Sequence, residues 1–164
     1  MTAAVLTIGL TLGWGPGTGV AVAGRDPRHG THGATTVNGE VPPGVVTIAD
    51  VTLLLQQRLG GGRALYQYRS ERPVGTRAPI HTHPFGGSSC VIEGENTLRI
   101  EGVPRARTVP AGNCYFMPSG PAMVNYSSGT VPLVAIDTFI LAKGQRPWVV
   151  TEPGREDLQR QFRR

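Results

Sequence analysis

The sequence predicts an all-β domain, a sandwich or barrel of short strands joined by tight turns. Gly (23) and Pro (14) together exceed a fifth of the 164 residues, whereas charged residues make up only 16%. This composition disfavours long helices and coiled coils. A hydrophobic content of 39% at such low charge density is enough to bury a core, which excludes extended disorder. The length suits one domain of ordinary size.

Short segments of alternating or β-branched residues recur from Val45 onward, and Gly or Pro residues mark the turns between them. Residues 64–69 alternate in the way that a strand with one buried face does. The only helical pattern, a weak one, spans residues 155–162. The predicted strands are 51–55, 64–69, 80–83, 88–92, 96–100, 106–109, 114–117, 122–126 and 133–141. Their regular spacing is typical of a β-sandwich or barrel.

The N-terminal residues 1–23 resemble a signal peptide. Residues 3–14 are apolar and uncharged, and Ala21-Val22-Ala23 supplies the small residues that signal peptidase accepts before Gly24. Glycines and Pro16 make the apolar stretch too short and broken to span a bilayer as a helix, so no stable membrane span is expected. We therefore expect export, to the periplasm or beyond. Because no Lys or Arg precedes the apolar stretch, a disordered leader or an upstream start stays open.

Residues 24–44 are rich in Gly, Pro and Thr and are predicted to be a linker, in which His29 and His32 are expected to be exposed. The β-domain is predicted over 45–148, followed by an Arg-rich tail over 149–164. The net charge of +5 comes from 15 Arg and one Lys, scattered along the chain without interleaved aromatic residues. This pattern indicates a solvated surface and no nucleic-acid partner. An acidic membrane surface stays open for the tail alone.

Two spaced motifs resemble those of the cupin superfamily. In the first, Gly75 is followed after five residues by His81-Thr82-His83, and later by Glu93-Gly94 and Gly102. In the second, Gly112 is followed after five residues by Pro118-Ser119-Gly120, and then by Met123. The resemblance covers about residues 75–128, and the flanking strands extend it to 48–142. It implies a small single-domain cupin of the type-2 kind, whose fold is a double-stranded β-helix or jelly-roll barrel.

His81 and His83 are the predicted metal ligands. Residues two apart in a strand point to the same face, so both imidazoles are expected to face the barrel and hold one Cu, Mn, Fe, Ni or Zn ion. Cupins commonly add a Glu and a further His. At those positions the resemblance places Gly87 (or Ser88) and Met123, whose thioether would favour copper. Either Met123 completes a weakened site, or it only fills space beside a metal-free pocket.

Three further residues are predicted to face a small-molecule ligand. Ser89 shares the face of Gly87, and Asn125 shares the face of Met123. Arg77 has the parity of His81 and could hold an anionic group, unless Pro79 breaks the register. On the opposite face, Cys90 is expected to be a buried apolar residue or a disulfide partner, and sequence separation alone cannot establish pairing with Cys114.

These features predict an exported cupin that binds a divalent transition metal and a small molecule inside its barrel. Two alternatives stay open: a metal-dependent enzyme (dioxygenase, isomerase or lyase), and a metal-free ligand-binding module. Two histidines without a carboxylate do not form the facial triad of non-haem iron oxygenases, which counts against oxygen activation at iron. The resemblance also implies a possible homodimer. The sequence does not identify the metal, the substrate or the oligomeric state.

Overall fold

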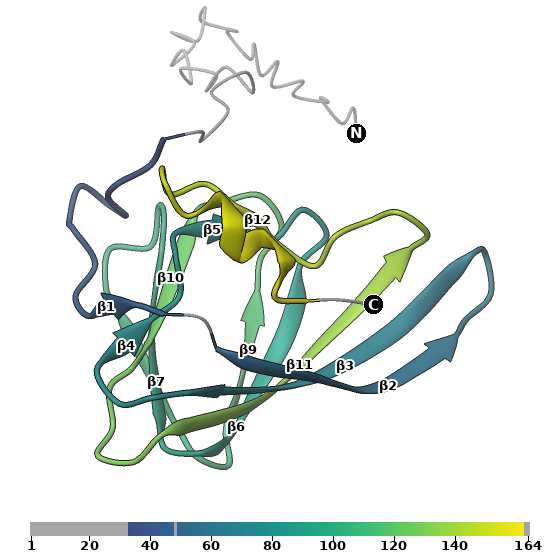
Figure 1. Ribbon diagram of the computed structural model, residues 1–164, viewed down its shortest axis with the longest axis horizontal. Coiled ribbons are helices and arrows are strands. Elements are labelled where there is room, and N and C mark those ends of the chain that lie inside the picture. The colour runs from purple at the N-terminus through teal and green to yellow at the C-terminus, as the bar shows by residue number, and fades with distance from the viewer. Residues whose placement is uncertain (1–32, 48, 163–164) are drawn as a thin grey trace, which may run out of the picture. The chain divides into compact units, whose positions relative to one another are not determined.

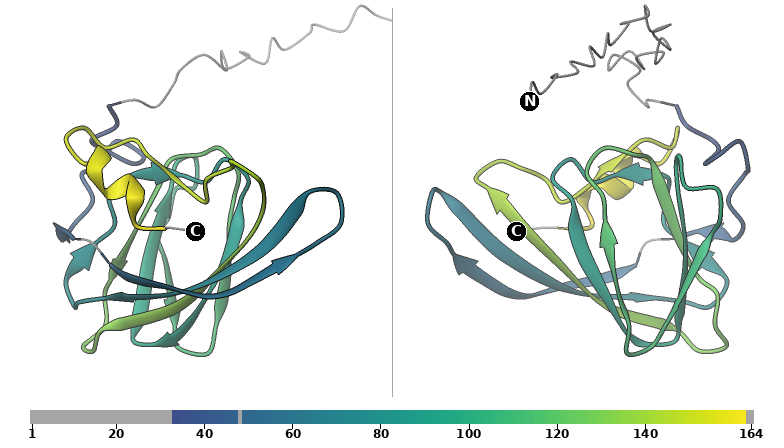
Figure 2. Two further views of the ribbon diagram at one scale, coloured as in Figure 1. Left: turned by 45° about the vertical axis from the view of Figure 1, so that its right-hand side comes forward. Right: turned by 180° about the vertical axis from the view of Figure 1, so that it is seen from behind.

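The computed structural model describes residues 33–47 and 49–162, which form two β-sheets around a shared core (Figures 1 and 2). The five-stranded sheet has the order β2 (Asp50–Arg58), β3 (Arg63–Arg72), β11 (Leu133–Ala142), β6 (Gly87–Glu93) and β9 (Cys114–Met117). The second sheet has the order β1 (Val45–Val46), β4 (Thr76–Arg77), β10 (Met123–Ser127), β5 (His81–Thr82) and β12 (Val149–Val150). Two further strands extend it from β10: β7 (Glu95–Ile100) pairs with β10, and β8 (Arg107–Pro110) pairs with β7. The prediction of an all-β barrel is confirmed.

The main core lies between the two sheets, and alternation explains which side chains fill it. In β3, residues Ala64, Tyr66 and Tyr68 are buried, whereas the residues between them are partly exposed. In β11, Phe139 and Leu141 face the same interior. The opposite sheet contributes Leu98, Val109 and Met123. The hydrophobic effect of these apolar faces therefore holds the two sheets together.

The hairpin of β2 and β3 extends beyond the rest of the five-stranded sheet (Figure 1). β2 is the end strand of that sheet, so one of its edges is unpaired among the described residues. A register shift between Leu53 and Leu55 marks a bulge. Leu53, Leu54 and Leu55 are all exposed. This edge is the largest departure from a closed barrel.

The structure differs from the predicted linker and tail, because parts of both pack against the barrel. Val37 is fully buried with Ile80 and Val124. The Asn38 amide donates to the carbonyl oxygen of Ile100 at 3.0 Å. At the other end, β12 pairs with β5, and the short 3₁₀ helix η1 (Glu156–Arg160) follows it. Residues 33–44 and 149–162 are thus integral to the folded unit.

The predicted signal peptide, together with His29 and His32, lies outside the described residues. Within the ranges that the structure describes, no helical segment has the length and apolarity needed to cross a membrane.

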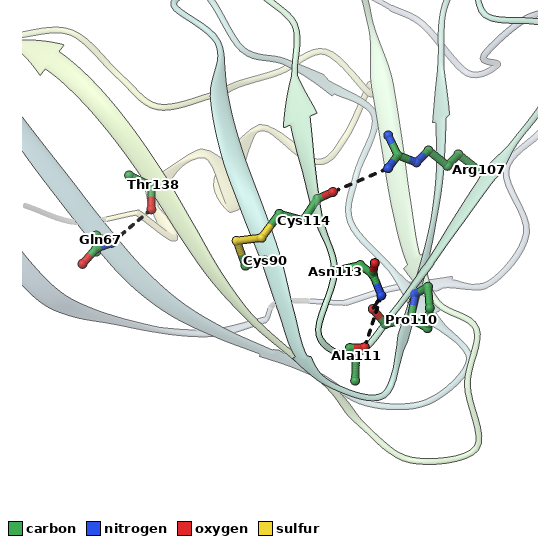
Figure 3. Close-up of a disulfide and its surroundings, with 8 residues drawn as sticks. All are labelled: Gln67, Cys90, Arg107, Pro110, Ala111, Asn113, Cys114 and Thr138. Carbon is green, nitrogen blue, oxygen red and sulfur yellow. Dashed lines mark hydrogen bonds between the residues drawn. A yellow bond between two sulfur atoms is a disulfide. The ribbon is translucent and has the colours of Figure 1, made fainter.

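A disulfide joins Cys90 of β6 to Cys114 of β9, which face each other directly across the two strands (Figure 3). Both side chains lie on the outer face of the sheet, because their neighbours Ser89 and Tyr115 are buried on the inner face. The pairing that the sequence left open is thereby established, and Cys90 is a disulfide partner. Since the two half-cystines are tied together outside the barrel, neither takes part in the interior site.

Candidate functional site

One cavity of about 40 Å³ lies inside the barrel, and the histidine pair lines it. Five of the six predicted site residues reach this cavity: His81, His83, Met123, Ser89 and Asn125. The volume admits only a few water molecules, whereas pockets for drug-sized ligands measure roughly 300–1,000 Å³. The cavity as it stands is therefore sized for an ion and its bound waters.

The two imidazoles face each other, as the spacing of His81 and His83 predicts. The Nε2 atoms of the two rings are 3.1 Å apart. Nδ1 of His81 lies 2.8 Å from the carbonyl oxygen of Pro79, and Nδ1 of His83 lies 2.8 Å from that of Pro147. Because a carbonyl oxygen only accepts, each neutral ring carries its proton on Nδ1. Both Nε2 atoms consequently present lone pairs to each other.

Burial keeps both imidazoles neutral. It lowers the pKa of His83 to about 4, with the Pro147 hydrogen bond opposing the shift only in part. Burial also lowers the pKa of His81 well below its usual value, and the neighbouring His83 adds to this effect. Near neutral pH neither ring takes up a second proton, so a shared proton does not relieve the repulsion between the lone pairs. A cation bound to both nitrogens would relieve it.

The geometry of the pair suits one transition-metal ion. Two nitrogens that each lie about 2.1 Å from one ion, at roughly a right angle, are about 3.0 Å apart. The observed separation of 3.1 Å matches this arrangement. A backbone carbonyl on the far nitrogen fixes the tautomer and the ring orientation, as is usual for metal-bound histidines. Among the described residues, no group of three or more His, Cys, Asp or Glu side chains could complete the set.

Gly87 stands at the position where cupins commonly have a metal-binding Glu, and the packing around it explains why no larger side chain fits. A Cβ atom at Gly87 would lie 2.6 Å from Cδ1 and 2.7 Å from Cε1 of Phe139, so the position has no room for a side chain. The Phe139 ring stacks on the His83 imidazole, with the ring centroids 5.6 Å apart. Thus an aromatic ring occupies the space beside the histidine pair that a Glu at this position would need.

Met123 lies at the position that the second motif predicts, directly opposite His81 in the pairing of β10 with β5. Its side chain is almost completely buried and belongs both to the cavity wall and to the main hydrophobic core. Asn125 lines the same cavity two residues further along β10, and its amide donates to the Oδ1 atom of Asn96 at 3.3 Å. Whether Met123 binds a metal stays a prediction, because both of its roles are compatible with this position.

Arg77 requires a correction, because it lies outside the cavity lining. Its guanidinium forms a bidentate ion pair with Glu152, at 2.7 and 2.8 Å, and also donates to the carbonyl oxygen of Ala78. Burial alone would raise the pKa of Glu152, but hydrogen bonds from Arg77 and from the Ile80 amide hold that pKa below its usual value. The register change at Pro79 separates Arg77 from the face of His81. Arg77 therefore fixes the chain that leads into the C-terminal segment.

Sequence reasoning missed a second polar group in the same cavity. Arg72 and Asp137 line the cavity wall on the five-stranded sheet. Burial lowers the pKa of Arg72 to about 10 and raises the pKa of Asp137. The alternation of buried and exposed residues could have revealed both. Arg72 lies an even number of residues from Tyr66 and Tyr68 in β3, and Asp137 lies two residues from Phe139 in β11, so each shares a buried face. A single charged residue on an otherwise apolar, buried face of a strand is unusual and indicates a polar cavity wall.

The fold is shared with solved cupins. The DMSP lyase DddQ from Ruegeria pomeroyi DSS-3 is 24% identical, with a TM-score of 0.52 over 65% of this chain and 53% of the lyase. A cupin-like protein from Thermotoga maritima is 22% identical, with a TM-score of 0.51 over 67% of this chain and 80% of that one. A cupin 2 domain-containing protein from Halorhodospira halophila is 15% identical, with a TM-score of 0.51 over 68% and 73%.

These likenesses establish the double-stranded β-helix of the cupin superfamily as the fold of this chain, as its two motifs predict. The chain spans about half the length of the lyase. No family model matches the sequence, and no curated protein is significantly similar to it.

Proposed function

We propose that this cupin-fold protein binds a divalent transition-metal ion through His81 and His83 and holds a small-molecule ligand beside it. The observation that carries the proposal is the pair of Nε2 lone pairs 3.1 Å apart, with each Nδ1 held by a carbonyl oxygen. When bound, the metal would act as a Lewis acid toward an oxygen or nitrogen donor of the ligand. Met123 and Asn125 would stand beside it as a soft and a hard donor.

Metal titration of the purified, untagged protein tests this proposal. We expect one equivalent of Cu²⁺ or Zn²⁺ to bind, and the double variant His81→Ala, His83→Ala to lose that binding. The matched control is His29→Ala, His32→Ala, which also removes two closely spaced imidazoles from the same chain. Full metal binding by the first variant, or its loss in the second alone, would place the site elsewhere.

Export into an oxidising compartment is the second part of the proposal. The signal-like residues 1–23 and the Cys90–Cys114 disulfide both support it, because disulfides persist mainly outside the reducing cytosol. Fractionation of the source cells would test it directly. Protein that retains residues 1–23 in the cytosol, with both thiols free, would contradict it.

A metal-dependent enzyme is the alternative function. The specific observation in its favour is that Arg72 and Asp137 line the same cavity as the histidine pair, so ionisable groups lie beside the proposed metal. The similar DMSP lyase suggests the first activity to assay, cleavage of DMSP by the metal-loaded protein. Turnover that disappears in His81→Ala, His83→Ala would favour the enzyme; metal binding without turnover of that compound favours the binding function.

We further propose that two copies pair through β2. Its edge is unpaired in the described chain, and Leu53, Leu54 and Leu55 are exposed beside that edge. Edge strands with exposed apolar side chains are templates for pairing with another chain. Light scattering should show a dimer for the native chain and a monomer for Leu54→Lys, whereas Val131→Lys at another exposed apolar position should leave the dimer intact.

A further inference from the structure

The C-terminal residues Glu156–Phe162 lie against β12 and reach the cavity at their end. Residues Glu156–Arg160 form the short 3₁₀ helix η1, which follows β12 (Figure 1). Gln161 and Phe162 are both part of the cavity lining. The predicted Arg-rich tail thus contributes two side chains to the wall of the candidate site.

The Phe162 ring sits in a niche made by three other aromatic rings. It meets Tyr68, Phe139 and Trp148 edge to face, with centroid separations of 5.1, 5.7 and 5.2 Å. Edge-to-face contact at these distances is the favoured arrangement for aromatic pairs. Two of these rings also contact the histidine pair, since Trp148 lies 4.8 Å from His81 and Phe139 lies 5.6 Å from His83. The niche therefore adjoins the proposed metal site directly.

Hydrogen bonds of Gln159 and Gln161 tie this segment to the barrel, and one of them is a long bond of 3.4 Å from the Trp148 indole to the Gln159 carbonyl oxygen. The Gln159 amide donates to the carbonyl oxygen of Trp148 at 2.6 Å, and its Oε1 atom accepts from the Val150 amide at 2.8 Å. Gln161 adds a longer hydrogen bond of 3.3 Å to the carbonyl oxygen of Ala49. Leu158 supplies the other buried apolar contact. Terminal segments that are held by side-chain contacts and not by a strand ladder open locally while the rest of a domain stays folded.

The chain just before the segment combines a firm anchor with a pivot. Glu152 is fixed by its bidentate ion pair with Arg77 and by the Ile80 amide. Pro153 and Gly154 follow, and Gly154 adopts a φ of +73°, which glycine reaches without strain. Motion of residues 156–162 can therefore occur beyond a fixed point, once the Gln159 hydrogen bonds to Trp148 and Val150 are broken.

We propose that Glu156–Phe162 is a lid, and that the niche under Phe162 receives the aromatic ring of the ligand. The inference rests on the proposed function, since it assigns the ligand class of that same site. A cavity of about 40 Å³ cannot hold an organic ligand until the lid moves. The ligand class is a small aromatic molecule with an oxygen donor, such as a phenol or an aryl carboxylate. Its ring replaces Phe162 and its oxygen faces the histidine pair.

Quenching of Trp148 fluorescence by acrylamide tests the lid independently of any metal. In a Trp14→Phe background Trp148 is the only tryptophan, and it is only 2% exposed when the lid is closed. Gln159→Ala removes both hydrogen bonds to Trp148 and Val150 and should raise the quenching constant at least about threefold. Arg160→Ala, an exposed position in the same helix, is the matched control and should not change it. Equal quenching constants in the two variants would contradict the proposal that this segment is a lid.

Metal release then tests the lid and the niche together. With Zn²⁺ bound, a chromogenic chelator should extract the ion about tenfold faster from Phe162→Ala than from the native chain. Toluene, which fits the space vacated by a phenyl ring, should bind Phe162→Ala and restore slow extraction. Fast extraction that toluene leaves unchanged would show that the niche does not hold a ligand ring. If no variant binds Zn²⁺, the proposed function fails while the fluorescence result still decides the lid.

Discussion

Two polar clusters face the same cavity from opposite sheets, and they satisfy their hydrogen bonds in different ways. The imidazole pair, His81 and His83, uses backbone carbonyl oxygens and leaves one nitrogen of each ring without a donor. The acid cluster is built around Asp137, which accepts a hydrogen bond of 2.8 Å from the Ser70 hydroxyl of the neighbouring strand. Asp137 thus has a donor within its own sheet, whereas the Nε2 atoms of the imidazole pair face only each other.

This difference supports the proposed position of the ion, between the two imidazoles. Buried polar groups that are already paired stabilise a single arrangement of the barrel. Facing lone pairs cost free energy until a cation occupies the space between them. The two clusters also respond to pH with opposite sign, because burial lowers the pKa of each imidazole and raises the pKa of Asp137.

The largest expected effect is acid destabilisation of the metal-free protein. Folded His83 has a pKa of about 4 against 6.5 when unfolded, so between these values the unfolded state binds more protons. The free energy of unfolding should therefore fall by about 1.4 kcal/mol per pH unit as the pH drops from 6.5, about 3 kcal/mol in all for this residue. Urea unfolding in the presence of a chelator, at several pH values, measures this change.

One substitution in each cluster should change the pH dependence of the free energy of unfolding in opposite directions. His83→Gln removes one titrating imidazole and should flatten the slope between pH 6.5 and 4. Asp137 opposes the histidines, because a raised pKa in the folded state means that stability falls as the pH rises from the unfolded to the folded pKa of this carboxyl. Asp137→Asn should therefore steepen the acid loss. A slope that neither substitution alters would show that both clusters are solvated.

The next effect concerns Gly87, which packs against Phe139 and Met117. In Gly87→Ala the new methyl group meets the Phe139 ring at 2.6 Å and the Met117 methyl group at 3.0 Å. Overpacking of this kind costs about 1–3 kcal/mol in a close-packed core. Thermal unfolding should show the loss, and Gly87→Ala combined with Phe139→Leu should recover most of it. Full stability of the single variant would mean that Phe139 is free to move aside.

Sequence alternation accounts for much of this comparison and misses the rest for a physical reason. A period of two within each strand, counted from the motif positions that the cupin resemblance supplies, predicted that His81, His83, Ser89 and Asn125 face the interior, and all four line the cavity. It could not show that Asp137 lies across from the histidines, because that depends on which strands are neighbours and in what register.

The same limit applies to Arg77 and Phe162. Parity with His81 directed Arg77 inward, but the pairing register along β10 shifts between Arg77 and His81, and Glu152, 75 residues away in sequence, binds the guanidinium. Phe162 lies outside the predicted barrel, and only tertiary packing brings its ring to Tyr68. Contacts between distant segments are set by the whole fold, so local patterns carry no signal for them.

The smallest expected effect tests whether Met123 belongs to the imidazole pair or only to the core. Met123→Leu nearly conserves volume, so the free energy of unfolding should change by less than about 1.5 kcal/mol. If the thioether is a ligand, calorimetry should show copper binding weakened about tenfold while zinc binding is nearly unchanged, because sulfur is a soft donor. Equal copper affinity in both proteins would make Met123 a packing residue and leave a site with two protein ligands. Either way the experiment separates the packing of β10 against β5 from the chemistry of the histidines beside it.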